Sequence, residues 1–183
     1  MKCFFRILCF VSVLFMVSIT NAQELNWIHM DEALDLQKEN PKKILMKVYV
    51  EDDICEYCER MDKETFSNKK LIRYVQENYY TVYLNGEGDD VIHYNDFEYT
   101  NPNYIQGKKG RNSTHLFVNA LQLSTYPSLV FFETDGSVIQ AIGGFKDAQE
   151  LEVYLKMVAT DEYKKITTAE AWEAYQKAFK GNF

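Results

Sequence analysis

Apolar and polar positions alternate in blocks along the chain, and each block has the period of a strand or of a helix. Residues 44–50, 79–84 and 128–133 are short apolar runs rich in β-branched and aromatic side chains, which predicts buried strands. A fourth strand at 137–142 follows the third across a turn that contains Asp135-Gly136, the pattern of a β-hairpin. We therefore expect four strands, of which the last two pair with each other.

Between the strands, apolar residues recur at helical spacing. Asn40-Pro41 ends the first predicted helix, because the residue before a proline disfavours the helical conformation. Ser67-Asn68 is expected to break or bend the second helix. The expected helices cover 27–39, 55 to about 77, 113–123, the stretch after Asp147, and about 167–180.

The two C-terminal helices carry the clearest signals. Asp147 is a good N-cap with Glu150 three residues further on, which is the pattern of a capping box. In the last helix, Trp172, Tyr175 and Phe179 form an apolar stripe. Such a stripe usually faces its own core, so we expect these side chains to be buried, with docking of a partner as the alternative.

Residues 86–112 interrupt this rhythm, since neither helical nor strand periodicity persists in them. A segment of this length between core elements is usually functional or disordered. Its aromatic side chains have two open interpretations: they pin the segment to the domain, or they present a surface to a partner. These aromatic residues are Tyr94, Phe97, Tyr99 and Tyr104.

The N-terminus has the layout of a secretory signal peptide. Two basic residues precede an uncharged apolar run over 7–19, and Thr20-Asn21-Ala22 follows it. The run is shorter than the roughly 20 apolar residues of a membrane span, which favours cleavage after Ala22 over a permanent anchor. We expect residues 1–22 to be removed and residues 23–183 to form one exported domain, either periplasmic or secreted.

Charge narrows the range of partners. The leader holds two basic residues and no acidic one, so its removal takes the formal net charge from −7 to −9. Such an acidic protein is a poor candidate for sequence-independent nucleic-acid binding, which depends on Lys and Arg at phosphates. We therefore expect no nucleic-acid partner, and the sequence predicts no particular oligomeric state.

Cys55 and Cys58 are the only cysteines outside the leader. A bridge between such near neighbours closes a very small loop and adds little stability by the chain-entropy account, so redox chemistry explains the pair better than a structural bridge. The alternative, half of a zinc site, lacks a second cysteine pair or a His-x-x-x-His to complete four ligands. We expect no metal and no organic cofactor. A predicted helix begins at Cys55, and its unpaired N–H groups would favour a thiolate there.

The order of elements around these cysteines resembles the thioredoxin superfamily over about residues 27–159. The resemblance implies an α/β protein with the thioredoxin-like fold, in which helices flank a central mixed β-sheet. Residues 86–112 would be an insertion before the cis-proline element, and the helix at about 167–180 an addition. The matching features are the motif Cys55-Glu56-Tyr57-Cys58, the stretch 58–66, Tyr126-Pro127 before a strand, and Gly143-Gly144 after a hairpin.

The resemblance also implies roles for individual residues. Cys55 would attack the disulfide of a partner, and Cys58 would resolve the mixed disulfide. Pro127 matches the family's cis-proline, beside which the backbone of Tyr126 would pair with a substrate strand. The remaining expected substrate contacts flank the cysteines and are Ile54, Glu56 and Tyr57.

Two positions depart from the family pattern. Ile54 stands where the family often has Trp, and Tyr49 stands where thioredoxins proper carry a buried Asp that assists deprotonation of the second cysteine. Any proton acceptor for that cysteine is therefore expected from Glu51, Asp52 or water. Lys47 is the one charged residue inside the first predicted strand.

The charges around the motif indicate a direction for the chemistry. Glu56 and several acidic neighbours outnumber the basic residues Arg60 and Lys63. Negative charge opposes the Cys55 thiolate, so we expect a reductant or a moderate exchanger rather than a strong oxidant. Its substrates would be protein thiols or disulfides, and its redox partner a membrane-associated or thioredoxin-type protein. The alternative from another class is a binding module or chaperone-like protein with this fold and no redox turnover.

Overall fold

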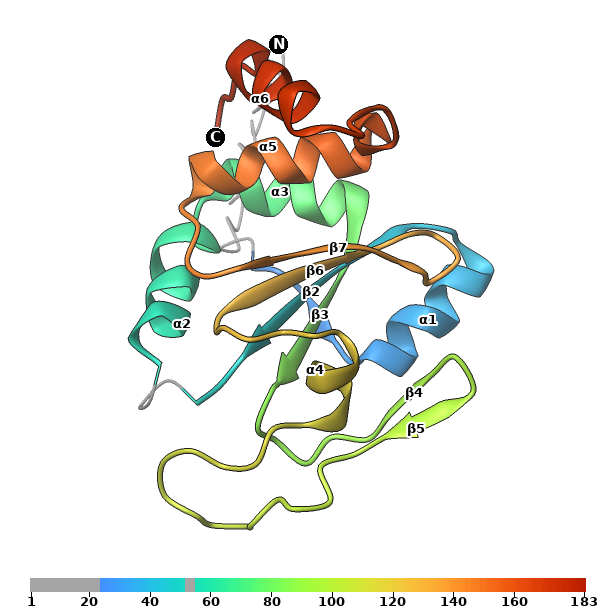
Figure 1. The fold of residues 1–183 in the computed structure, drawn as a ribbon, viewed down its shortest axis with the longest axis vertical. Helices are drawn as coiled ribbons and strands as arrows, with labels where there is room; N and C mark the ends of the chain where they lie inside the picture. The colour runs from blue at the N-terminus through green and yellow to red at the C-terminus, as the bar shows by residue number, and fades with distance from the viewer. Residues whose placement is uncertain (1–23, 52–54) are drawn as a thin grey trace, which may run out of the picture.

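A five-stranded mixed sheet forms the centre of the molecule (Figure 1). The computed structural model describes residues 24–51 and 55–183. The strand order is β1-β3-β2-β6-β7, with β1 and β2 parallel to β3, and β6 antiparallel to both β2 and β7. The predicted mixed sheet is confirmed. Its strands are β1 (Trp27–Ile28), β2 (Lys43–Tyr49), β3 (Tyr79–Asn85), β6 (Ser128–Phe132) and β7 (Val138–Gly143).

Helices cover both faces of this sheet. In Figure 1, α3 and α5 lie on one side and α1 and α4 on the other, and α6 lies outside α5. A π-helical turn over Met61–Thr65 extends α2, and a 3₁₀ turn over Glu162–Lys165 precedes α6. The α-helices are α1 (Met30–Glu39), α2 (Glu56–Arg60), α3 (Lys69–Asn78), α4 (Leu116–Ala120), α5 (Ala148–Ala159) and α6 (Ala169–Ala178).

The apolar runs of β2 and β6 are continuous because each strand is buried on both faces. In β2, Leu45 belongs to the core under α3 and α5, whereas Ile44 and Met46 belong to the core on the opposite face. In β6, Phe131 and Phe132 divide in the same way between the two cores. The alternation of a strand thus supplies both cores from one stretch of sequence.

Local capping sets the ends of several helices. Asp147 accepts a hydrogen bond from the N–H of Glu150 at 2.8 Å, and the Glu150 side chain accepts one from the N–H of Asp147 at 3.1 Å. The predicted capping box is therefore confirmed. The break expected near Ser67-Asn68 is also present, because the Asn68 side chain caps α3 by accepting from Lys70 and Leu71.

Three predictions about helices were wrong in part. Trp27-Ile28, expected to be helical, form β1, which pairs with Thr81 and Val82 of β3. Helix α1 begins only after His29, whose side chain accepts a hydrogen bond from the N–H of Asp31. The helix expected over 113–123 is limited to α4. The aromatic stripe of α6 faces the core as predicted, since Trp172 and Tyr175 pack against it, but it is half buried because α6 lies outside α5 as a third layer.

The segment over 86–112 contains a small β-hairpin, β4 (Ile92–Tyr94) and β5 (Phe97–Tyr99). The rings of Tyr94 and Tyr99 lie 5.3 and 5.1 Å from the ring of Phe117 in α4. These two aromatic residues therefore pin the segment to the domain, as one of the two interpretations predicted. Phe97 does not, since 67% of it is exposed.

Candidate redox site

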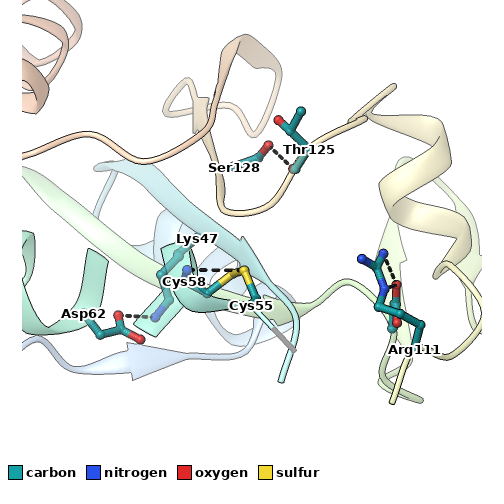
Figure 2. The surroundings of a disulfide bond; sticks show 8 residues. Lys47, Cys55, Cys58, Asp62, Arg111, Thr125 and Ser128 are labelled. Atoms are coloured by element: carbon teal, nitrogen blue, oxygen red, sulfur yellow. Dashed lines mark hydrogen bonds and ion pairs between the residues drawn. A yellow bond between two sulfur atoms is a disulfide. The ribbon is translucent and has the colours of Figure 1, made fainter. Parts of the chain in front are cut away.

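Cys55 and Cys58 form a disulfide at the N-terminus of α2, with their Cα atoms 5.3 Å apart (Figure 2). Cys55 occupies the N-cap position, and its Sγ accepts a hydrogen bond from the N–H of Cys58 at 3.2 Å. A sulfur in this position receives the unpaired backbone donors of the first helical turn. The same donors would stabilise a thiolate on Cys55 after reduction.

The two sulfur-bearing residues differ in exposure. Cys58 is 1% exposed, whereas Cys55 is half buried and the neighbouring Glu56 and Tyr57 are exposed. Thiol-disulfide exchange depends on access to the attacked sulfur. A partner can therefore reach Cys55 from solvent, while Cys58 can react only with a sulfur already held on Cys55.

The loop that enters β6 lies beside the disulfide in Figure 2. The Tyr126–Pro127 peptide bond in this loop is cis. The Ser128 hydroxyl donates to the carbonyl oxygen of Thr125 at 2.7 Å, and the Pro127 carbonyl accepts from the N–H of Gly144 at 2.8 Å. Among the residues that the structure describes, no backbone–backbone hydrogen bond engages Tyr126.

Gly86 makes room for the ring of Tyr126. A Cβ on Gly86 would lie 2.5 Å from Cε1 of Tyr126, closer than side-chain carbons approach in proteins. The Tyr126 hydroxyl donates to the Gly86 carbonyl at 3.4 Å, and burial raises the pKa of Tyr126 above its usual value of 10.0. The end of β3 thus fixes the residue that precedes the cis-proline, a contact between distant positions that the sequence pattern did not indicate.

Lys47, the charged residue in β2, is held by Asp62 at an Nζ to Oδ1 distance of 2.5 Å. The Lys47 side chain is 8% exposed and the Asp62 side chain 41%. Aromatic rings surround the ammonium group, with the ring centres of Trp27, Tyr49 and Phe66 5.0, 5.1 and 5.7 Å from it. Asp62 lies one helical turn after Cys58, so an ion pair between a buried lysine and a partly exposed aspartate adjoins the site, where the sequence predicted no such pair (Figure 2).

Of the expected side-chain proton acceptors for Cys58, Glu51 lies within the described residues and Asp52 does not. The Glu51 carboxylate accepts a hydrogen bond from the Asn85 side chain at 3.0 Å. Asp52 and Ile54 lie outside the described residues, and so does the predicted signal peptide over 1–22.

Both basic residues that follow Cys58 are paired with glutamates of the same helical stretch. Arg60 donates two hydrogen bonds to Glu64, at 3.0 and 3.1 Å, and Lys63 pairs with Glu59. Both cations are engaged by these glutamates, and Arg60 also interacts electrostatically with the exposed Glu56 beside Cys55. The local charge therefore keeps the acidic character that the sequence indicated.

Within 24–51 and 55–183, no group of three His, Cys, Asp or Glu side chains is arranged to hold a metal ion. The ring of His93, a candidate ligand in the acidic segment, contacts the carboxylates of Asp31 and Glu98. No helix formed by these described residues is long and apolar enough to cross a membrane.

A central mixed sheet, a Cys-x-x-Cys disulfide at a helix N-terminus and a cis-proline loop beside it together define a thiol-disulfide oxidoreductase of the thioredoxin fold. The chain belongs to the family of thioredoxin-like domains, whose model matches residues 30–159. No curated protein sequence is similar enough to this chain to count as a relative.

Solved structures agree with this fold. The chain is similar to a thioredoxin from Thermus thermophilus, with 15% identity, a TM-score of 0.55 and coverage of 75% of this chain and 89% of that one. It is also similar to a thioredoxin-fold protein from Helicobacter pylori, with 18% identity, a TM-score of 0.54 and coverage of 75% and 82%. A third similar structure, the DsbH oxidoreductase, has 17% identity, a TM-score of 0.51 and coverage of 76% and 87%. At these identities the likeness concerns the fold alone.

Proposed function

We propose that this protein is an extracytoplasmic thiol-disulfide oxidoreductase that works as a reductant or a moderate exchanger. Cys55 is the nucleophile and Cys58 the resolving thiol. The main evidence for the proposal is the unequal exposure of the two cysteines. Cys55 is half buried at a helix N-terminus, and Cys58 is 1% exposed behind it. This arrangement lets a partner disulfide meet one sulfur before the other.

The reaction in the reducing direction takes two steps. The Cys55 thiolate attacks one sulfur of the substrate disulfide, so that a mixed disulfide forms and one substrate thiolate leaves. Cys58 then loses its proton and attacks the Cys55 sulfur, which releases the second substrate thiolate. Two electrons pass to the substrate, its two thiolates take up protons, and the Cys55–Cys58 disulfide remains.

The substrate strand is proposed to lie along the cis-proline loop, where the backbone of Tyr126 next to Pro127 pairs with it. Glu56 and Tyr57, both exposed between the cysteines, would contact the same strand, and Ile54 would flank it. Edge pairing of this kind supplies backbone hydrogen bonds with little dependence on substrate sequence. It suits substrates that are protein thiols or disulfides, with a membrane-associated or thioredoxin-type protein to exchange electrons.

The direction of electron flow is inferred from charge. The exposed Glu56 beside Cys55, together with the pairing of Arg60 and Lys63 by glutamates, supplies no net positive field to stabilise the thiolate. A less stabilised thiolate makes the disulfide form a weaker oxidant.

Trapping of mixed disulfides tests the roles of the two cysteines. Cys58→Ser should accumulate a covalent adduct with a disulfide-containing peptide, visible by non-reducing electrophoresis and mass spectrometry. Cys55→Ser is the matched control and should form none, because its remaining thiol is buried. Equal trapping by both variants, or by neither, would contradict the assignment and favour a binding module without turnover.

For location and domain organisation, we propose that residues 1–22 are a cleaved signal peptide. Residues 23–183 would then form one domain, with an insertion over 86–112 and an added helix at about 167–180. The intact mass of protein recovered from outside the cytoplasm should correspond to a chain that begins at Gln23. A recovered chain that retains the leader would argue against cleavage.

A further inference from the structure

Three basic side chains lie within four residues of each other in the segment before Asn112, in a chain whose formal net charge is −7. They are Lys108, Lys109 and Arg111, and all three are exposed. Among the described residues, neither lysine has an ion-pair partner. We call the loop from Ile105 to Asn112 the basic loop.

The basic loop is closed by hydrogen bonds at its base. The Ile105 N–H donates to the Asn112 side chain at 3.1 Å, and the Asn112 amide donates back to the Ile105 carbonyl at 3.0 Å. Inside the loop, the N–H of Lys108 donates to the Ile105 carbonyl at 3.2 Å. These hydrogen bonds hold the backbone of the turn that bears the two lysines. Less conformational entropy is therefore lost when a partner binds to them.

A buried carboxylate anchors the basic loop, and Arg111 of the loop lies near Tyr126, the residue before the cis-proline. Glu87 is 5% exposed, and it accepts hydrogen bonds from Arg111 Nε at 2.5 Å and from the N–H of Asn112 at 2.7 Å. The Arg111 guanidinium lies 5.5 Å from the centre of the Tyr126 ring, while 59% of its side chain stays exposed. The loop thus adjoins the proposed path of the substrate strand.

The two sides of this path differ in charge. Glu51 and Glu56 are exposed on the side of the disulfide, and the three basic residues lie on the side of the loop. Figure 1 shows the loop between β5 and α4 below the start of α2, and Figure 2 shows the disulfide beneath the Thr125–Ser128 turn with Arg111 to one side. A substrate strand would therefore meet a negative surface at the disulfide and a positive one beyond Tyr126.

We propose that the basic loop recognises acidic residues of the substrate protein, Asp or Glu a few positions from its reacting cysteine. This inference rests on the proposed function and names a substrate class for the same site. Exposed charge pairs add modest affinity, but complementary charge raises association rates and selects partners. The effect should weaken with salt, because charges in solvent are screened.

The test compares three disulfide peptides that differ only in residues flanking one cysteine, which are Glu, Gln or Lys. The variant is Lys108→Glu with Lys109→Glu, and it leaves Arg111 and its contacts with Glu87 untouched. Lys177→Glu with Lys180→Glu is the matched control, since these lysines are exposed near the C-terminus and the change in charge is the same. The measured quantity is kcat/KM for peptide reduction.

At low ionic strength the loop variant should lose about fivefold in kcat/KM on the Glu peptide and keep its rate on the Gln peptide. The control variant should lose much less on the Glu peptide. The difference should vanish near 1 M salt, where the Debye length falls to about 3 Å. Equal losses on the Glu and Gln peptides, or equal losses in both variants, would overturn the proposal.

Binding of a cysteine-free Glu peptide, measured by fluorescence anisotropy, separates this proposal from the proposed function. If no peptide is reduced but the Glu peptide binds and the loop variant weakens that binding, the redox function fails and the recognition surface stands. If all peptides are reduced but the loop variant binds and reduces the Glu peptide as well as the parent protein does, the redox function stands and the recognition surface fails.

Discussion

Among the described residues, the ammonium group of Lys47 forms an ion pair with one carboxylate, that of Asp62. Replacing Asp62 by Asn would leave a largely buried cation among aromatic rings with no counter-charge. Because Asp62 is 41% exposed and water can partly replace it, we expect a loss of about 1–3 kcal/mol in the free energy of unfolding, less than for a fully buried pair. Urea unfolding of the oxidised protein measures this loss.

Lys47→Met is the matched variant for that prediction. An apolar side chain of similar length fits the ring-lined space, so this change should cost less than Asp62→Asn, and the double variant should recover stability relative to Asp62→Asn. Additive losses in the double variant would show that the two side chains do not stabilise each other.

Gly86 controls the position of Tyr126. In Gly86→Ala the new methyl group would lie 2.5 Å from the Tyr126 ring, so the ring must shift. We expect a loss of about 1–3 kcal/mol in stability, typical of overpacking, together with a several-fold lower rate of peptide reduction. Unfolding curves and peptide-reduction kinetics of the single variant measure both effects.

The control for this prediction removes the ring. In a Tyr126→Ala background the added methyl group has space, so Gly86→Ala should cost little further stability. If Gly86→Ala lost as much stability in that background as in the parent protein, the loss would come from the backbone at Gly86 and not from the contact with Tyr126.

Sequence analysis could predict some of the site residues and not others. Cys55 and Cys58 form a local motif, which needs no knowledge of the fold. The Lys47–Asp62 and Glu87–Arg111 pairs join positions 15 and 24 apart, and no local period records such pairing. The one available signal was a lysine inside an apolar strand, since a buried charge requires a partner.

Two hydrogen bonds join the β4–β5 hairpin to α1. Asp31 accepts one from the backbone N–H of His93 at 2.9 Å and contacts the His93 ring at 2.7 Å. The hydrogen bond with Asp31 raises the pKa of His93 above 6.5, because it favours the protonated ring. Any stabilisation from this contact is fully present below the unfolded value of about 6.5 and is lost as the pH rises through the folded pKa.

We therefore predict a His93 titration midpoint above 6.5 in proton NMR spectra. Asp31→Asn should return the midpoint toward 6.5, whereas Glu98→Gln should lower it less, because Asp31 makes the largest contribution. A midpoint that Asp31→Asn leaves unchanged would contradict this account of the tether between α1 and β4.

Elements that are set by contacts close in the sequence could be predicted, whereas elements that are set by contacts between distant positions could not. Asp147 and Glu150 cap α5 through contacts three residues apart, so the start of this helix could be predicted from sequence. Strand β1 could not, because two residues carry no period and become a strand only by pairing with β3. The half burial of Trp172 depends on where α6 packs, which its own apolar stripe does not specify.

Over the described residues, the molecule combines a covered mixed sheet with one Cys-x-x-Cys pair at one end of it. The mixed sheet could be expected because the motif and the order of elements resemble a known fold, whereas the pairing of β1 with β3 arises from contacts between distant positions. The function depends on a property of the complete protein, the relative stability of its disulfide and dithiol forms. Charge at the site favours neither a strongly stabilised thiolate nor a strong oxidant.

The equilibrium reduction potential of the Cys55–Cys58 pair tests this central claim most directly. The mature protein is titrated against thiol-disulfide buffers of defined potential, and the oxidised and reduced forms are counted by mass spectrometry. We predict a value below about −150 mV, in the range toward the thioredoxin value of about −270 mV. A value above about −150 mV would identify a strong oxidant and contradict the assigned direction.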